Sequence, residues 1–188
     1  MTRIAVILGS TRPGRRGQQV AEWVHEVAQK RGGADFDLID LAEHPLPHLD
    51  EAQPPMLAQY ANQHTKEWSA LVAQYDGYIF VTPEYNHSTS GALKNAIDYL
   101  FQEWNNKAAG IVSYGSRAGG ARAAEHLRLI LGELMVADVR AQVTIPIQQY
   151  FENWTSFRPD QQLEDDLGTL LDQVIAWSTA LQPLRAAS

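Results

Sequence analysis

The chain has 188 residues, of which 45% are hydrophobic and 20% charged, with a net charge of −7 at pH 7. This length suits one domain and is short for two, so we expect residues 1–188 to form a single domain. An acidic chain whose arginines gather only at residues 12–16 is not typical of nucleic-acid-binding proteins. The absence of cysteine excludes disulfides, thiolate catalysis and iron–sulfur clusters, so redox chemistry would require a bound cofactor.

No apolar run approaches the roughly 20 residues of a membrane span, and residues 4–8 form too short a run for a secretion signal. We therefore expect a cytoplasmic protein with no membrane partner. His44 and His48 lie in a loop broken by prolines, and no carboxylate pattern completes a ligand set around them. We expect no metal site.

Short apolar runs alternate with amphipathic segments along the chain. Runs rich in Val and Ile occupy residues 4–8, 78–82, 108–113 and 139–145, and residues 35–41 form a weaker fifth run. Apolar residues recur at helical spacing over 20–28, 57–75, 93–100, 127–134 and 163–177. This order predicts an α/β fold with a doubly wound, five-stranded parallel sheet of order 2-1-3-4-5 and helices on both faces. In such a fold, ligands bind at the carboxyl ends of the strands, near strands 1 and 3.

The first run ends in an unusual loop, residues 9–17, which reads GSTRPGRRG. Its hydroxyls, its glycines, three arginines and the helix that follows are groups that bind phosphate in proteins. The loop lacks both the G-x-G-x-x-G dinucleotide pattern and the G-x-x-x-x-G-K-[ST] pattern, so a monophosphate suits it better. A flexible, solvated basic loop is the alternative.

Two further loops follow the third and fourth predicted strands. Residues 82–91 offer the flat ring of Tyr85, the amide of Asn86 and three hydroxyls that could cap the next helix. Residues 113–120 contain three glycines, which let a ligand approach the backbone closely, although a plain glycine-rich turn is the alternative. All three loops would meet at one edge of the sheet, so we interpret them as one site.

These loops resemble the NADPH-dependent FMN reductase family, whose members have a flavodoxin-like fold. The resemblance spans residues 1–145 and rests on GSTR at 9–12, TPEYN at 82–86, GALKNAID at 91–98, and YGS with GG within 114–120. It implies an enzyme that binds FMN, oxidises NADPH or NADH, and reduces a quinone, flavin, azo compound or chromate by a ping-pong mechanism. It also implies a homodimer or homotetramer joined through helices near residues 91–104 and 119–135.

The resemblance also implies a role for residues of each loop. Ser10 and Arg12 would hold the FMN phosphate; because the sequence departs from the family pattern beyond Arg12, our further candidates are Arg16, Gly17 and Gln18. The isoalloxazine ring would be lined by Pro83, Glu84, Tyr85 and Asn86, and its pyrimidine side by Ser113, Gly115 and Ser116. No side chain needs a catalytic role, because the flavin carries the redox chemistry.

Two other functions share this strand order. A flavodoxin-type one-electron carrier would be favoured by acidic residues around the flavin, whereas the first loop is basic and the third nearly free of acids. A response-regulator receiver needs acidic residues after strand 1 and an aspartate after strand 3, which this chain lacks there. The sequence leaves three locations open for the aromatic residues of the later part of the chain: the core, a subunit interface and the acceptor pocket. These residues are Trp104, Tyr150, Phe151 and Trp154.

Overall fold

The structure, a computed structural model, describes residues 1–186. Its centre is a five-stranded parallel sheet in the order β2-β1-β3-β4-β5, which confirms the predicted topology. The strands are β1 (Arg3–Leu8), β2 (Asp35–Asp40), β3 (Gly77–Pro83), β4 (Ala108–Gly115) and β5 (Ala137–Pro146). β3 and β4 are buried along their whole length, as expected for apolar runs in a sheet that is covered on both faces.

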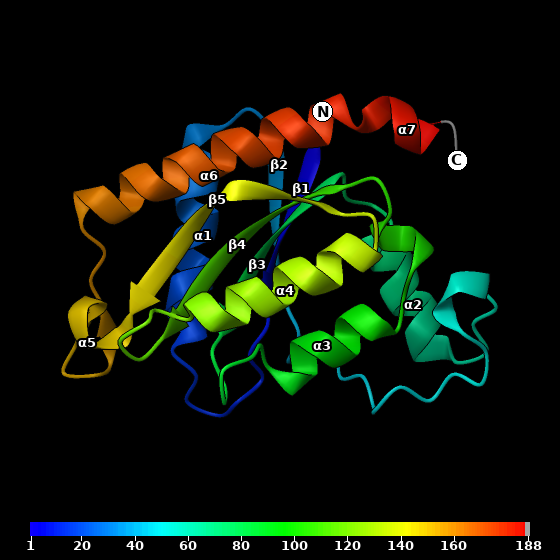
Figure 1. Cartoon of the computed structure of the whole chain (residues 1–188), viewed down its shortest axis with the longest axis horizontal. Helices are drawn as coiled ribbons and strands as arrows, with labels where there is room; N and C mark the ends of the chain where they lie inside the picture. The colour runs from blue at the N-terminus through cyan, green and yellow to red at the C-terminus, as the bar shows by residue number, and fades with distance from the viewer. Residues whose placement is uncertain (187–188) are drawn as a thin grey trace.

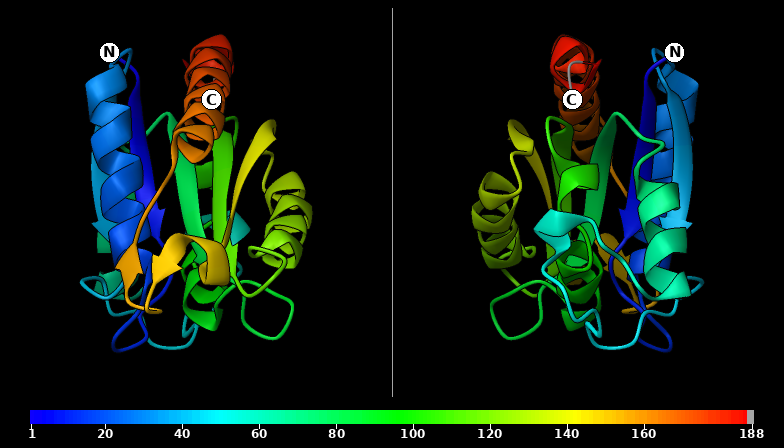
Figure 2. Two further views of the ribbon diagram at one scale, coloured as in Figure 1. Left: turned by 90° about the vertical axis from the view of Figure 1, so that its left-hand side faces the viewer. Right: turned by 90° about the vertical axis from the view of Figure 1, so that its right-hand side faces the viewer.

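Helices cover both faces of this sheet (Figures 1 and 2). One face packs against α1 (Gly17–Arg31) and α6 (Gln161–Ala180), and the other against α2 (Gln63–Val72), α3 (Gly91–Asp98) and α4 (Ala121–Glu133). Successive residues of β1 face opposite sides, so Val6 joins the α1–α6 core and Ile7 the core beneath the other helices. Short elements complete the chain: η1 (Pro55–Leu57), η2 (Gln102–Trp104), α5 (Ile147–Tyr150), β6 (Phe151–Glu152), β7 (Ser156–Phe157) and α7 (Gln182–Ala186).

The helix expected over residues 57–75 is shorter in the structure, because α2 begins only at Gln63. The 3-10 turn η1 is followed by Ala58, its C-cap, whose φ of 51° is left-handed. The Glu51 carboxylate then accepts hydrogen bonds from the amides of Ala61 and Asn62, at 2.8 and 3.0 Å. These contacts hold residues 58–62 as a loop, and apolar periodicity alone does not reveal them.

The late aromatic residues divide between the core and the surface. Trp104 is buried in the α2–α3–α4 core, with its ring centroid 4.9 Å from that of Tyr78. Tyr150 and Phe151 are buried in the core beneath α1 and α6. Trp154, in contrast, is exposed at the turn of the β6–β7 hairpin. Of these four aromatic residues, only Trp154 has a side chain free to meet a ligand.

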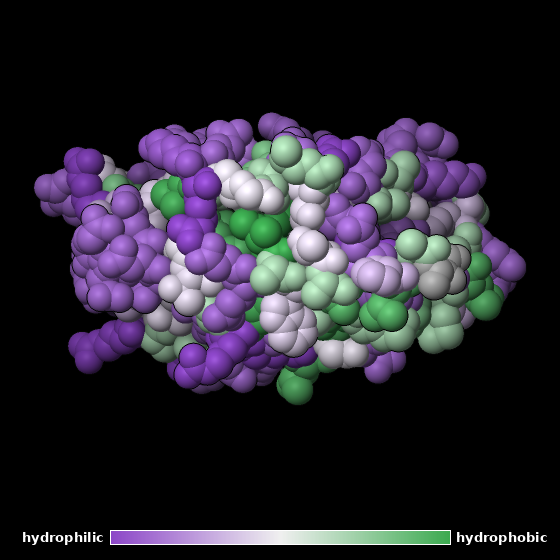
Figure 3. All heavy atoms as spheres, turned by 90° about the horizontal axis from the view of Figure 1, so that it is seen from above, coloured by the Kyte–Doolittle hydropathy of each residue, from purple (hydrophilic) through white to green (hydrophobic). Residues whose placement is uncertain are grey.

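The surface seen from above is mainly hydrophilic at its left end, and apolar residues lie across its middle and toward its lower right (Figure 3). The exposed large apolar side chains of the molecule include Trp177 of α6 and Leu184 of α7. Among residues 1–186, no helix combines the length and apolarity that crossing a bilayer would take.

Candidate functional site

The loops that follow β1, β3 and β4 meet at the carboxyl edge of the sheet, along the lower edge of Figure 1. Together with Ile147 they line a single cavity of about 190 Å³. Its lining residues are Arg12, Gly14, Arg15 and Arg16 of the first loop, Pro83, Glu84 and Tyr85 of the second, and Tyr114, Gly115 and Ser116 of the third. The structure therefore brings together the three loops that we interpreted as one site.

The arginines of the first loop differ in what they contact. Arg15 forms an ion pair with Asp40 at the end of β2, and Arg16 donates its Nε hydrogen to the Trp154 carbonyl at 2.5 Å. Arg12 is exposed, and its guanidinium makes no hydrogen bond or ion pair with residues 1–186, although its carbonyl accepts the Arg15 amide at 3.1 Å. Because Asp40 neutralises Arg15, Arg12 is the guanidinium most available to an anion.

The first turn of α1 is open to a negatively charged group. Arg16 occupies the N-cap position without a side-chain capping bond, and the first turn contains no acidic residue. The leading amides of a helix lack partners within it and carry the positive end of its dipole. Gly17, the first residue of the helix, is closely packed, because a Cβ there would lie 2.3 Å from the Tyr114 hydroxyl oxygen. Gly17 therefore lets the third loop approach the start of α1.

The second loop is a tight turn whose geometry depends on Asn86 and His87. The backbone groups of Tyr85 and Ser88 exchange hydrogen bonds of 2.9 and 3.1 Å around them. Their φ values of 50° and 69° are both left-handed, as in a type I′ turn, and asparagine tolerates that conformation well. Asn86 therefore has a backbone role here, and its side chain does not line the cavity.

Two serines connect the first loop with the second. Ser10 is fully buried, and its hydroxyl lies 2.9 Å from the hydroxyl of Tyr85. Ser90 caps α3 by accepting a hydrogen bond from the Leu93 amide at 3.1 Å, and it donates its own proton to the Gly9 carbonyl. Ser10 therefore orients Tyr85, and Ser90 anchors the loop in which Ser10 lies.

Glu84 connects the second loop with α4. Its carboxylate accepts hydrogen bonds from the Arg122 amide at 3.1 Å and from Arg122 Nε at 2.7 Å. Burial favours a higher pKa for this carboxyl, but the hydrogen bonds and charge of Arg122 outweigh it and lower the pKa below the usual value. Arg122 was not among the predicted site residues, because the contact spans 38 residues and leaves no local signal in the sequence.

Two further predicted site residues, like Ser10 and Asn86, direct their side chains elsewhere. The buried Ser113 hydroxyl donates to the Gly119 carbonyl at 2.9 Å, and so shapes the third loop from within. The exposed Gln18 side chain donates to the Glu22 carboxylate one turn later in α1, at 3.0 Å. Neither side chain lines the cavity.

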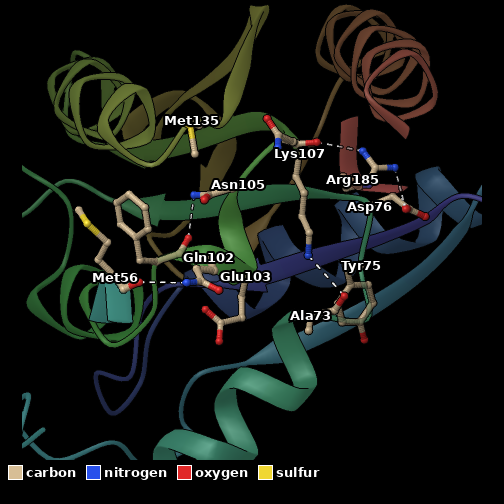
Figure 4. A pocket seen from close by; sticks show the side chains of 12 residues that line it. Met56, Ala73, Tyr75, Asp76, Gln102, Glu103, Asn105, Lys107, Met135 and Arg185 are labelled. Atoms are coloured by element: carbon tan, nitrogen blue, oxygen red, sulfur yellow. Dashed lines mark hydrogen bonds and ion pairs between the residues drawn. The ribbon is translucent and has the colours of Figure 1, made fainter. Parts of the chain in front are cut away.

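A larger cavity, of about 680 Å³, lies at the opposite edge of the sheet, beside the starts of β3 and β4 (Figure 4). Two of the charged side chains that line it, Arg185 and Lys107, already have partners within the protein. Arg185 pairs with Asp76 at 2.8 Å, and Lys107 donates to the Val72 carbonyl at 3.2 Å and to the Tyr78 hydroxyl at 2.9 Å. The cavity at the carboxyl edge, with Arg12 free, is therefore the better candidate for a charged ligand.

A parallel sheet of this order, with a cationic loop and an uncapped helix after its first strand, defines a flavodoxin-like protein. A solved structure with this fold is FerB, a flavoenzyme NAD(P)H:(acceptor) oxidoreductase from Paracoccus denitrificans. It aligns with a TM-score of 0.74 at 22% identity, over 96% of this chain and 98% of FerB.

The sequence comparisons name the family. Residues 2–149 match the NADPH-dependent FMN reductase family. An NAD(P)H-dependent FMN reductase of Nectria sp is 43% identical over 140 residues, which cover 70% of each chain. One of Schizosaccharomyces pombe is 38% identical over 148 residues, 77% of this chain and 74% of that one. The chain belongs to this family: it is a flavin-dependent oxidoreductase of the NAD(P)H-dependent FMN reductase type, and its cofactor is FMN.

More distant relatives differ in the acceptor that their names state. A protein of Oryza sativa subsp. japonica named "Probable NADPH:quinone oxidoreductase 2" is 32% identical over 136 residues, 68% of this chain and 63% of that one. An FMN-dependent NADPH-azoreductase of Staphylococcus haemolyticus is 26% identical over 176 residues, 92% of this chain and 93% of that one.

Proposed function

We propose that the three-loop cavity holds FMN and that the protein passes hydride from NAD(P)H to a small electron acceptor. The observation that supports this most is the convergence of Arg12, Tyr85 and Gly115 on one cavity. When bound, FMN supplies the two-electron redox chemistry, and the protein supplies position and charge. Two features of the cavity suit FMN: an unpaired guanidinium beside an uncapped helix for the phosphate, and an aromatic turn for the ring.

The phosphate would be held at the first turn of α1. Arg12 and Arg16 line the cavity there, and the amides of Gly17 and Gln18 belong to the open first turn. Ser10 contributes through Tyr85, whose hydroxyl it contacts, rather than from the cavity wall. In this proposal Gln18 acts through its amide, because its side chain is bonded to Glu22.

The flavin ring would lie between the second and third loops. Pro83 and Tyr85 form one side of this slot, and Gly115 with Ser116 the other. A Cβ on Gly115 would lie 3.2 Å from that of Glu84 and 3.1 Å from the Gly120 amide nitrogen, so glycine lets the second and third loops pack closely here. Backbone amides of the third loop would stabilise the negative charge that develops on the reduced ring. Glu84, Asn86 and Ser113 would hold these loops in shape.

NAD(P)H and the acceptor would use the same open side of the cavity in turn, which is the physical basis of a ping-pong mechanism. The sequence has no separate dinucleotide fingerprint that would let both bind at once. The acceptors that we propose are quinones, flavins, azo compounds and chromate, and the quinone and azo relatives support the first and third. Arg117 is exposed on the third loop, where it can meet the 2′-phosphate of NADPH.

We also propose that the protein is a homodimer or homotetramer joined through α3 and α4. Leu129 of α4 is 77% exposed. It borders a groove between the two helices, which Lys94 and His126 also line. An apolar side chain beside polar ones on paired helices is typical of a surface that a second copy covers.

One spectroscopic experiment tests the function directly. The purified protein is loaded with FMN and treated anaerobically with excess NADPH or NADH, and its visible spectrum is recorded. We expect the flavin bands to bleach, and the colour to return when a quinone is added. A flavin that stays oxidised with both nucleotides would favour the one-electron carrier and exclude the reductase.

A further inference from the structure

We propose that the hydroxyl of Tyr114 is a ligand of the FMN phosphate and donates a hydrogen bond to it from the third loop. The inference rests on the proposed function, in which FMN occupies this cavity. It adds a neutral donor to the arginines and helix amides of the phosphate end. It also gives Tyr114 a role distinct from that of Gly115 and Ser116, which would face the ring.

The observation that carries the proposal is a buried hydroxyl that forms no hydrogen bond of ordinary geometry within the protein. Tyr114 is 5% exposed, and its oxygen has no hydrogen-bond partner among residues 1–186. Burying a hydroxyl without a partner is costly, and proteins rarely leave one in that state. The residue itself is well fixed, because its carbonyl accepts the Glu84 amide at 3.0 Å. The hydroxyl therefore lies in a defined place and lacks an acceptor.

That place is the first turn of α1. A Cβ on Gly17 would lie 2.3 Å from the Tyr114 oxygen, so the hydroxyl is against the first residue of the helix. Tyr114 also lines the same cavity as Arg12 and Arg16. The uncapped helix start, the free guanidinium and the unpartnered hydroxyl therefore lie at one end of the same cavity or directly beside it. A group with several acceptor oxygens and negative charge satisfies all three, and the phosphate of FMN is such a group.

The phenol stays protonated to a higher pH than an exposed tyrosine, so it can act as a hydrogen-bond donor. Burial raises the pKa of Tyr114 above its usual value, although the neighbouring Ser10 side chain, the Gly17 amide and the charge of Arg15 act against that shift. A neutral phenol can donate one hydrogen bond to a phosphate oxygen. Hydrogen bonds to charged acceptors are stronger than neutral ones, so this contact contributes selectively to the phosphorylated flavin.

The test compares FMN with riboflavin, which lacks the phosphate, in the apoprotein carrying Tyr114→Phe. Dissociation constants are measured by quenching of flavin fluorescence. We expect the FMN dissociation constant to rise about ten- to a hundredfold, and the riboflavin constant to change by less than about twofold. The melting temperature of the apoprotein is expected to stay the same or rise, because the substitution removes a hydroxyl that has no partner.

Tyr78→Phe is the matched control. Its hydroxyl lies at the opposite edge of the sheet and is partnered, since it donates to the Val72 carbonyl at 3.0 Å and accepts from Lys107 at 2.9 Å. This variant is expected to lower the apoprotein melting temperature and to leave the FMN-to-riboflavin ratio unchanged. If Tyr114→Phe likewise lowered the apoprotein melting temperature and left the FMN-to-riboflavin ratio unchanged, the Tyr114 hydroxyl would have a structural role and the proposal would be overturned.

The phosphate could also be the 2′-phosphate of NADPH, and kinetics separate the two sources. In the FMN-saturated enzyme, Tyr114→Phe is expected to leave the ratio of the NADPH and NADH KM values unchanged. A shift in that ratio with unchanged FMN affinity would overturn the assignment to FMN. Equal weakening of FMN and riboflavin would overturn it as well. If the wild-type protein bound neither flavin, the proposed function itself would fail, which is a different result.

Discussion

Glu84 and Arg122 join the second loop of the site to the start of α4, although 38 residues separate them. The carboxylate receives both the Arg122 backbone amide and its guanidinium, so one side chain holds the helix by two kinds of donor. The Glu84 side chain is 6% exposed, whereas that of Arg122 is 43% exposed. Glu84 is therefore the buried partner of this ion pair, and it lies next to the proposed ring slot.

Glu84→Gln is expected to destabilise the protein by about 1–2 kcal/mol near neutral pH, since it weakens a partly exposed charged pair without leaving a cavity. The pKa of Glu84 is lowered in the folded protein, so its contribution is present above the unfolded pKa and lost as the pH falls through the folded pKa. Denaturant unfolding of both proteins across this acidic range measures the difference, which should shrink with acidification. A difference that stayed constant would contradict the assignment. Glu152→Gln, which breaks the exposed Arg158 pair, should cost less than about 0.5 kcal/mol.

Gly17→Ala tests how closely the third loop approaches α1. The added methyl would lie 2.3 Å from the Tyr114 oxygen and 2.9 Å from Leu8 Cδ1, so one side chain must move. We expect a loss of about 1–3 kcal/mol in unfolding free energy and weaker FMN binding. Gly91→Ala is the control, because nothing lies within 4 Å of a Cβ there and the residue begins α3. Equal stability of the two variants in thermal unfolding would disprove the close contact.

The sheet order could be predicted from the sequence because its signals are local. The Val- and Ile-rich runs of β1, β3 and β4 and the amphipathic segments between them each lie within a few residues. The loops of the site could be predicted for the same reason, since a cationic glycine loop or an aromatic turn is visible in one stretch of sequence. Their convergence then followed from the topology of parallel strands.

The contacts within the site could not be predicted, because they join residues that are far apart along the chain. Nothing near Arg15 indicates that Asp40 neutralises it, and nothing near Glu84 indicates Arg122. Sequence patterns identify which groups reach the edge of the sheet. Which of those groups stay free for a ligand depends on packing.

Ser90→Ala is expected to affect both stability and cofactor binding. The serine caps α3 and also holds the Gly9 carbonyl of the phosphate loop, so its loss should cost about 1–2 kcal/mol and raise the FMN dissociation constant. Asp160→Ala removes a comparable cap from α6, where the carboxylate accepts the Leu163 amide at 2.9 Å. That variant should lose similar stability and keep its FMN affinity. Fluorescence titration of both variants decides the point, and equal loss of affinity in the two would show that Ser90 acts only as a cap.

The buried amine of Lys107, at the opposite edge of the sheet, should make the stability of the protein depend on pH in the alkaline range (Figure 4). Its burial lowers the pKa of the amine from 10.5 to about 8. Between these values the unfolded chain binds more protons than the folded protein, so stability should rise with pH. Lys107→Met removes this effect, and the wild-type protein should therefore gain up to about 3 kcal/mol relative to the variant between about pH 8 and 10.5. Denaturant unfolding at several pH values measures the gain, and Lys66→Met, at an exposed lysine of α2, is the matched control. A constant difference between wild type and Lys107→Met would mean that the amine titrates alike in both states.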